Sequence, residues 1–147
     1  LSRYACEYDG RAITFILDVA HNAQAADFLA EQVSSCKIAV LAMLVDKEPA
    51  AVVAALPQID CWQLAGLQGY RGQGSEALHT RIGSSADDRI LNCHATVKDA
   101  MIASLQMDYD EILVIGSFLT VSAAEQALSN IDGLIMKQAE GIKRVTE

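Results

Sequence analysis

A buried strand that turns directly into a helix is predicted by Ile13-Thr14-Phe15-Ile16-Leu17-Asp18-Val19-Ala20-His21-Asn22. Its first seven residues are mostly apolar on both faces and rich in β-branched side chains, which is typical of a strand covered on both sides. Ala25, Leu29 and Val33 then recur at helical spacing, so residues 22–33 should form an amphipathic helix. This strand–helix unit is the one from which parallel α/β sheets are built.

The same alternation continues along the chain. Further apolar runs predict strands at residues 38–44, 59–65, 89–93 and 111–115. Helix-patterned segments begin near residues 48, 75, 97 and 121, and a Gly-rich loop spans residues 66–74. Residues 134–144 predict a helix or a frayed end. The predicted fold class is α/β: a Rossmann-like, mostly parallel sheet of five or six strands with helices on both faces, in one domain over residues 1–147.

Composition narrows the classes of function. The chain has 147 residues, a hydrophobic content of 52%, a formal net charge of −8 and a pI of about 4.7. Such a charge disfavours binding to nucleic acid or to an acidic membrane. The longest apolar run is far shorter than a bilayer span, and no signal-peptide pattern opens the chain, so we expect a cytoplasmic protein. Four widely spaced cysteines predict reduced thiols and neither a disulfide framework nor a metal site.

Polar residues follow the first predicted strand, and ligands of open α/β sheets bind beyond the carboxyl ends of strands. Asp18 closes the strand, His21 lies in the turn, and Asn22 is suited to cap the helix. The carboxylate and the imidazole could face one ligand. Equally, Asp18 and Asn22 could tie the turn together and leave His21 exposed, and the spacing alone leaves both interpretations open.

Two further clusters follow later strands. Asp46-Lys47-Glu48 places a cation at the sheet edge, which suits an anion but is also ordinary for a solvated loop. Gly116-Ser117-Phe118-Leu119-Thr120 begins a helix with small and hydroxyl residues, which can present donors to a carboxylate or phosphate, or simply cap the helix. Arg71 lies in the Gly-rich loop, where an arginine is more often a surface residue than a ligand clamp. Neither a G-x-x-x-x-G-K-[ST] phosphate loop nor a G-x-S-x-G elbow occurs in the sequence.

The three clusters, in this order, resemble motifs of the carboxy-terminal domain in the folate branch of the Mur ligase superfamily, the dihydrofolate synthase/folylpolyglutamate synthase family. The family patterns L-D-x-A-H-N-P, M-L-x-D-K-[DE] and G-S-F-x-T-V correspond to residues 17–23, 43–48 and 116–121. Tyr70-Arg71-Gly72 resembles a P-R-[GA] loop. Ala23 and Tyr70 stand where the family usually has proline, which leaves the polar positions intact but makes the role of Arg71 less certain.

The resemblance implies an ATP-dependent ligase that activates a substrate carboxylate as an acyl phosphate, which the amine of L-glutamate then attacks. ATP and Mg²⁺ would be bound mainly by a covalently linked central domain that this chain lacks, so the chain alone should be inactive. The pteroyl substrate would be dihydropteroate or a reduced folate, and the enzyme a monomer. His21 is implied as the best candidate general base, and the substrate- or nucleotide-binding residues would be Asp18, Asn22, Asp46, Lys47, Arg71, Ser117, Phe118 and Thr120. Two alternatives remain: a cell-wall Mur ligase domain, or a free-standing Rossmann-like module that binds a nucleotide or an amino acid.

Overall fold

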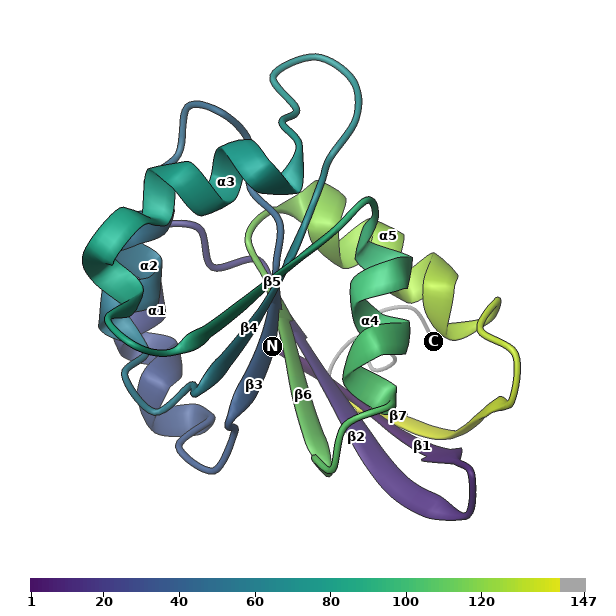
Figure 1. Ribbon diagram of the computed structural model, residues 1–147. Helices are drawn as coiled ribbons and strands as arrows, with labels where there is room; N and C mark the ends of the chain where they lie inside the picture. Colours follow the sequence, from purple (N-terminus) through teal and green to yellow (C-terminus); the bar gives the residue numbers. More distant parts are fainter. Residues whose placement is uncertain (141–147) are drawn as a thin grey trace.

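The computed structural model describes residues 1–140, and a seven-stranded sheet runs through them in the order β5-β4-β3-β6-β2-β1-β7 (Figure 1). Five neighbouring strands, from β5 to β2 in that order, pair in parallel. They are β2 (Arg11–Asp18), β3 (Ile38–Leu41), β4 (Cys61–Ala65), β5 (Ile90–His94) and β6 (Glu111–Ile115). Two antiparallel strands, β1 (Ser2–Tyr8) and β7 (Leu134–Glu140), extend the sheet beyond β2. The predicted strands are confirmed, with bounds that shift by a few residues.

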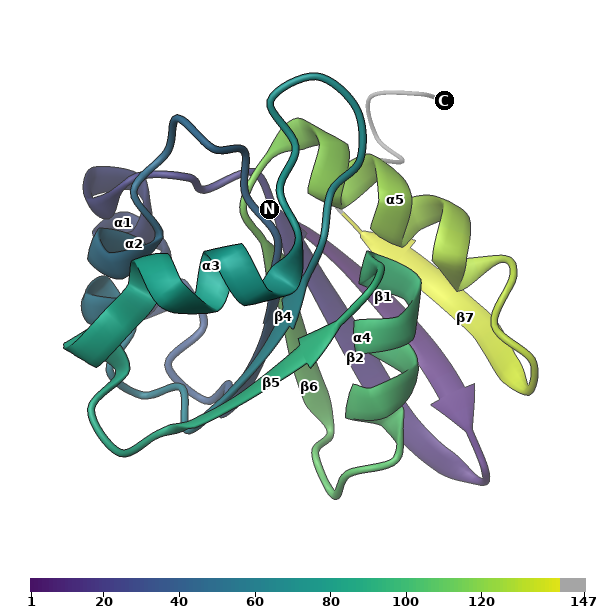
Figure 2. The same ribbon diagram turned by 45° about the horizontal axis from the view of Figure 1, so that its top comes forward.

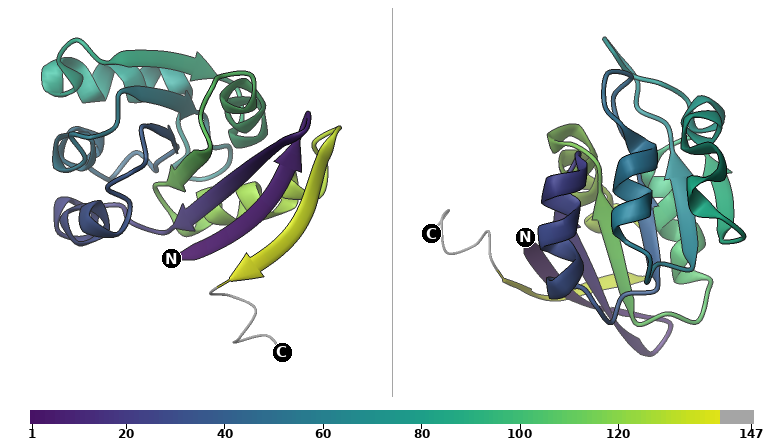
Figure 3. Two further views of the ribbon diagram at one scale, coloured as in Figure 1. Left: turned by 90° about the horizontal axis from the view of Figure 1, so that it is seen from below. Right: turned by 90° about the vertical axis from the view of Figure 1, so that its left-hand side faces the viewer.

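Helices cover both faces of the parallel part of the sheet, as the sequence predicts (Figures 1 and 3). One layer contains α1 (Ala23–Gln32), α2 (Pro49–Ala55) and α3 (Ser75–Ile82), which continues into a 3-10 turn, η1 (Gly83–Ala86). The opposite layer contains α4 (Val97–Leu105) and α5 (Phe118–Leu128). The α/β fold class is therefore confirmed.

The core divides into two apolar clusters, one on each side of the sheet. On β2, Phe15 and Leu17 pack into the cluster beneath α4 and α5, whereas Ile16 packs into the cluster beneath the other helices. The largest buried side chain is Trp62 of β4, which is fully buried in the second cluster. Burial of a large apolar side chain contributes about 1.5–3 kcal/mol, so strands buried on both faces provide much of the stability of this domain.

The antiparallel extension was not predicted, and the sheet has seven strands instead of five or six. β1 alternates buried and partly exposed residues, and it joins β2 through a two-residue turn at Asp9 and Gly10. Both turn residues have positive φ, 51° and 79°, which is the geometry that an Asp-Gly hairpin turn favours. The predicted helix at residues 134–144 is wrong over its first part, because Leu134–Glu140 pairs with β1 as a strand. Its last residues, 141–144, lie outside the described part of the chain.

The parallel strands all end at one edge of the sheet, so the segments that follow them lie together there. In Figure 2 this edge is tilted toward the viewer, and the β4–α3 loop (residues 66–74) projects from it at the top. Within residues 1–140, no helix has the length and apolarity that would take it across a bilayer. All four cysteines are free thiols, and three of them are buried.

Candidate functional site

The turn after β2 is held by its own polar side chains. Asp18 Oδ2 accepts a hydrogen bond from the Ala20 amide at 3.0 Å, and Asn22 Oδ1 accepts one from the Ala25 amide at 2.8 Å. Asn22 is thereby the N-cap of α1, as predicted. His21 Nδ1 lies 2.9 Å from the Val19 carbonyl oxygen. Because a carbonyl only accepts, Nδ1 carries a proton, and Nε2 is the ring atom left to accept one.

The first two predicted clusters meet in a hollow between the starts of α1 and α2, which we call the α1–α2 hollow. It has a volume of about 430 Å³ and is lined by His21, Asn22, Ala23, Gln24, Asp46, Lys47, Glu48 and Ala51. An imidazole, a carboxamide and an ammonium group therefore border one open space at the carboxyl edge of the sheet, together with the carboxylates of Asp46 and Glu48. The Lys47 ammonium can bind an anionic group there, and the His21 imidazole can accept a proton from a neighbouring amine.

The third cluster is built into the start of α5. Ser117 is the N-cap, and its Oγ accepts a hydrogen bond from the Thr120 amide at 3.0 Å. Thr120 Oγ1 donates to the Ala42 carbonyl at 2.6 Å, so the Ser117 hydroxyl is the donor in the 2.8 Å bond between Ser117 Oγ and Thr120 Oγ1. Both residues are buried. The hydroxyl groups thus join α5 to the end of β3 as well as capping the helix.

The backbone at the start of this motif requires glycine at position 116. Its φ is +135°, and a Cβ built on it would lie 2.0 Å from the Ala42 carbonyl oxygen. The end of β6 can approach Ala42 this closely only without a side chain.

Replacing Ser117 by alanine is expected to lower the free energy of unfolding by about 1–2 kcal/mol, the usual cost of losing an N-cap. The Thr120 amide would lose its acceptor, and Thr120 Oγ1 would lose a donor. The measurement is chemical denaturation of the protein that carries the substitution, with Ser122→Ala, an exposed position on the same helix, as the control. Equal stability of the two variants would contradict the capping role.

Asp18 and Phe118 belong to a different hollow, between β2 and α5. It has a volume of about 550 Å³ and is lined by Leu1, Ser2, Leu17, Asp18, Val19, Phe118, Val121, Ser122 and Glu125. The structure thus divides the predicted residues between two sides of the sheet edge. Phe118 is 74% exposed and offers an apolar surface beside the Asp18 carboxylate.

Arg71 lies in the β4–α3 loop and forms an ion pair with Asp46. The hydrogen bond from Arg71 keeps the pKa of Asp46 below its usual value. The backbone is also engaged, because the Val45 amide donates to the Arg71 carbonyl at 2.8 Å. Arg71 does not line the α1–α2 hollow, so in this arrangement its charge meets Asp46 and holds two loops together.

Sequence reasoning missed Gln73 and Arg81. Gln73 is buried and donates to the Met43 carbonyl at 2.9 Å, while Arg81 donates to the Lys47 carbonyl. Neither residue belongs to a motif that the sequence analysis considered. Only their contacts with residues about 30 positions away mark them as relevant.

The remaining histidines lie apart from both hollows. His79 is exposed on α3, whereas His94 Nε2 lies 2.8 Å from Gln63 Oε1. Burial lowers the pKa of His94, which favours its neutral form and a structural role.

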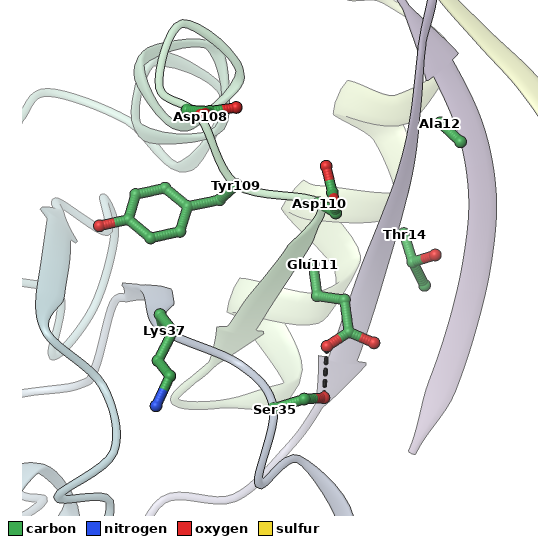
Figure 4. A pocket seen from close by; sticks show the side chains of 8 residues that line it. All are labelled: Ala12, Thr14, Ser35, Lys37, Asp108, Tyr109, Asp110 and Glu111. Atoms are coloured by element: carbon green, nitrogen blue, oxygen red, sulfur yellow. Dashed lines mark hydrogen bonds between the residues drawn. The ribbon is translucent and has the colours of Figure 1, made fainter.

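Another hollow, of about 690 Å³, lies at the opposite, amino edge of the sheet (Figure 4). It is lined by Ala12, Thr14, Ser35, Lys37, Asp108, Tyr109, Asp110 and Glu111. Ser35 Oγ donates a hydrogen bond to Glu111 Oε1 at 2.5 Å, drawn as a dashed line in Figure 4. No predicted site residue borders this hollow, and parallel sheets place their ligands at the other edge.

Comparison with known proteins identifies the fold family. The family described as "Mur ligase, glutamate ligase domain" matches residues 3–118. The chain belongs to this family. The Mur ligase domain is 36% identical over 119 residues to the dihydrofolate synthase/folylpolyglutamate synthase of Haemophilus influenzae, a match that covers 74% of this chain and 27% of that protein. The domain spans about a quarter of the length of the curated relatives it matches.

Solved structures give the same result. The bifunctional folylpolyglutamate synthase/dihydrofolate synthase of Yersinia pestis, complexed with AMPPNP and Mn ion, has 32% sequence identity and a TM-score of 0.67. The match covers 84% of this Mur ligase domain and 30% of that chain. A bifunctional enzyme of the same name with Mn, AMPPNP and L-glutamate bound has 28% identity, a TM-score of 0.65 and coverages of 84% and 30%. The predicted resemblance to the folate branch of the superfamily is confirmed.

Proposed function

We propose that this domain is the glutamate-binding, cleft-closing part of an ATP-dependent ligase that joins L-glutamate to dihydropteroate, to folylpolyglutamate, or to both. The observation that carries the proposal is the α1–α2 hollow. There His21, Asn22 and Lys47 come together at the carboxyl edge of a Mur ligase domain. The bound L-glutamate and ATP analogue of a solved relative support the same substrate classes.

The reaction forms one amide bond. A carboxylate of the pteroyl substrate is first activated as an acyl phosphate, and the glutamate nitrogen then attacks the acyl carbon. The bond from that carbon to the phosphate oxygen breaks, phosphate leaves with the bonding electrons, and the nitrogen loses a proton. His21 Nε2 is the proposed acceptor of that proton, because Nδ1 is already engaged by the Val19 carbonyl.

Lys47 and Asn22 would supply the binding contacts. The Lys47 ammonium suits a carboxylate of glutamate or a phosphate oxygen, and the Asn22 side-chain nitrogen remains available while its oxygen caps α1. Asp18 and Phe118 would contact nucleotide or substrate from the β2–α5 hollow. Closure of these groups over a second domain would exclude water, which would otherwise hydrolyse the acyl phosphate.

The residues of this chain account for only part of a binding site for ATP and Mg²⁺. The sequence has no phosphate-binding loop, and within residues 1–140 no three His, Cys, Asp or Glu side chains are grouped to hold a metal ion. Lys47 and Asn22 could contact a nucleotide, whereas most phosphate and metal ligands would come from a covalently linked central domain. When bound there, ATP supplies the phosphoryl group that activates the carboxylate. The proposal therefore includes that this chain alone is inactive.

The test is a kinetic assay of the full-length protein that contains this domain. We expect phosphate release that requires ATP, L-glutamate and either dihydropteroate or a reduced folate. Lys47→Met should lower kcat/KM for glutamate about 10- to 100-fold, the range expected for losing a charged hydrogen bond of about 1.5–3 kcal/mol. Lys98→Met, at an exposed position on α4, is the matched control.

Two results would contradict the proposal. One is phosphate release that does not depend on glutamate with either pteroyl substrate. The other is a Lys47→Met enzyme whose glutamate kinetics match those of Lys98→Met.

A further inference from the structure

The loop that carries Lys47 is also held by two residues that do not line the α1–α2 hollow, Arg81 and Gln73. Arg81, in the last turn of α3, donates from Nη2 to the Lys47 carbonyl. Its Nη1 lies 3.3 Å from Gln73 Oε1, and Gln73 Nε2 donates to the Met43 carbonyl at 2.9 Å. One continuous chain of hydrogen bonds therefore joins α3 to both ends of residues 43–47.

Gln73 and Met43 are buried, whereas Arg81 is exposed. Gln73 is 8% exposed and Met43 is fully buried, so the Met43 carbonyl depends on the Gln73 amide for its hydrogen bond. Arg81 uses two nitrogens of one planar guanidinium, which fixes the Lys47 carbonyl relative to Gln73. A lysine at this position has a single nitrogen and would not reproduce both contacts in the same geometry.

The same loop is anchored independently at other backbone groups. The Val45 amide donates to the Arg71 carbonyl at 2.8 Å, and the Lys47 amide donates to the Leu44 carbonyl at 3.2 Å. With its backbone held in this way, Lys47 has its side chain left to line the hollow. Arg81 does not line that hollow, so it would act on a ligand there by holding the loop and not by contact.

We propose that Arg81, supported by Gln73, is a positioning residue that sets where the Lys47 ammonium sits in the α1–α2 hollow. This inference rests on the proposed function, in which Lys47 binds an anionic substrate group. Removing Arg81 frees the Lys47 carbonyl and widens the range of backbone positions at Lys47. The Lys47 ammonium then spends less time in the position from which it contacts the anionic group of the substrate.

Arg89 provides a contrasting arginine in the same layer. It donates to five backbone carbonyls, those of Val53, Leu56, Ile59, Ser85 and Ala86, and has no hydrogen bond to the Lys47 loop. Its loss should lower stability without moving Lys47. Arg89→Met is therefore the control for a purely structural effect, and Thr80→Ala, beside Arg81 on the exposed side of α3, is the control for substitution on this helix.

The experiment uses the full-length protein and measures kcat and KM for glutamate in Arg81→Met, Lys47→Met and the double variant, below the melting temperature of each. We expect Arg81→Met to lower kcat/KM for glutamate about 5- to 50-fold, no more than Lys47→Met, by analogy with other misplaced charged contacts. The double variant should be no worse than Lys47→Met alone, because Arg81 acts through Lys47. Thr80→Ala and Arg89→Met should retain wild-type kinetics, although Arg89→Met should melt at a lower temperature.

Arg81→Lys keeps the charge and one donor, so we expect a smaller loss than in Arg81→Met. It also serves as the test if Arg81→Met does not fold. Kinetics of both Arg81 variants equal to those of Thr80→Ala would overturn the inference, as would losses that multiply in the double variant. A Lys47→Met enzyme with unchanged kinetics would instead contradict the proposed function of the hollow.

Discussion

Alanine in place of Gly116 is expected to lower the free energy of unfolding by about 2–6 kcal/mol, from two costs that add. The new Cβ would lie 2.0 Å from the Ala42 carbonyl oxygen, far inside contact distance. Relieving that overlap requires a shift between β3 and β6, and overpacking of this kind costs about 1–3 kcal/mol. The φ of +135° adds about 1–3 kcal/mol of backbone strain for any residue with a side chain.

Gly69→Ala separates the two costs. Gly69 also has a positive φ, +91°, but a Cβ there would meet nothing within 4 Å. It should therefore show the cost of the backbone conformation alone, about 1–2 kcal/mol. Chemical denaturation of both variants measures the difference. If Gly116→Ala costs no more than Gly69→Ala, the close approach to Ala42 is not a constraint on the fold.

Replacing His21 by alanine is expected to lower kcat of the full-length protein in the proposed ligase reaction by about 10²- to 10⁴-fold, the range for losing a general base. Stability should change little, because His21 is only partly buried and its Nδ1 makes one hydrogen bond within the turn. The measurement is turnover at saturating ATP, glutamate and pteroyl substrate. His79→Ala, at an exposed position on α3, is the matched control.

A second substitution at His21 tests which nitrogen matters. Asparagine can still donate to the Val19 carbonyl from a position like that of Nδ1, but it has no counterpart of Nε2. His21→Asn should therefore keep the turn and lose as much turnover as His21→Ala. Recovery of most of the activity in His21→Asn would mean that His21 shapes the turn and takes no proton.

The parallel part of the fold could be predicted because its signals are local. Residues 13–19 and 111–115 are apolar runs of strand length, and helix α1 shows its buried stripe and its Asn22 cap in the sequence itself. For β7 the local sequence points to the wrong element. Its residues Met136, Lys137 and Gln138 favour helices locally, and only pairing with β1, more than 120 residues away in sequence, makes this segment a strand. No local pattern reveals such a partner.

The positions of the candidate site residues could likewise be predicted only in part from the sequence. The turn at Asp18, His21 and Asn22 and the loop at Lys47 follow predicted strands, so the sheet geometry brings them to one edge. The sequence did not show that Asp18 would lie in the β2–α5 hollow, on the other side of that edge, or that Arg71 would pair with Asp46. These outcomes depend on side-chain directions and loop paths that spacing does not determine.

The pairing of β1 with β7 has a consequence for the order of folding. Ser2–Tyr8 can form a hairpin with β2 early, because a two-residue turn joins them. Its other edge stays open until residues 134–140 arrive, so a chain still growing on the ribosome carries an unpaired strand edge while the residues between β1 and β7 are made. Closing so long a loop adds little to the equilibrium cost, since that cost grows only with the logarithm of loop length. Contacts between such distant segments slow folding, so the docking of β7 onto a strand made more than 120 residues earlier is expected to come late in the assembly of this domain.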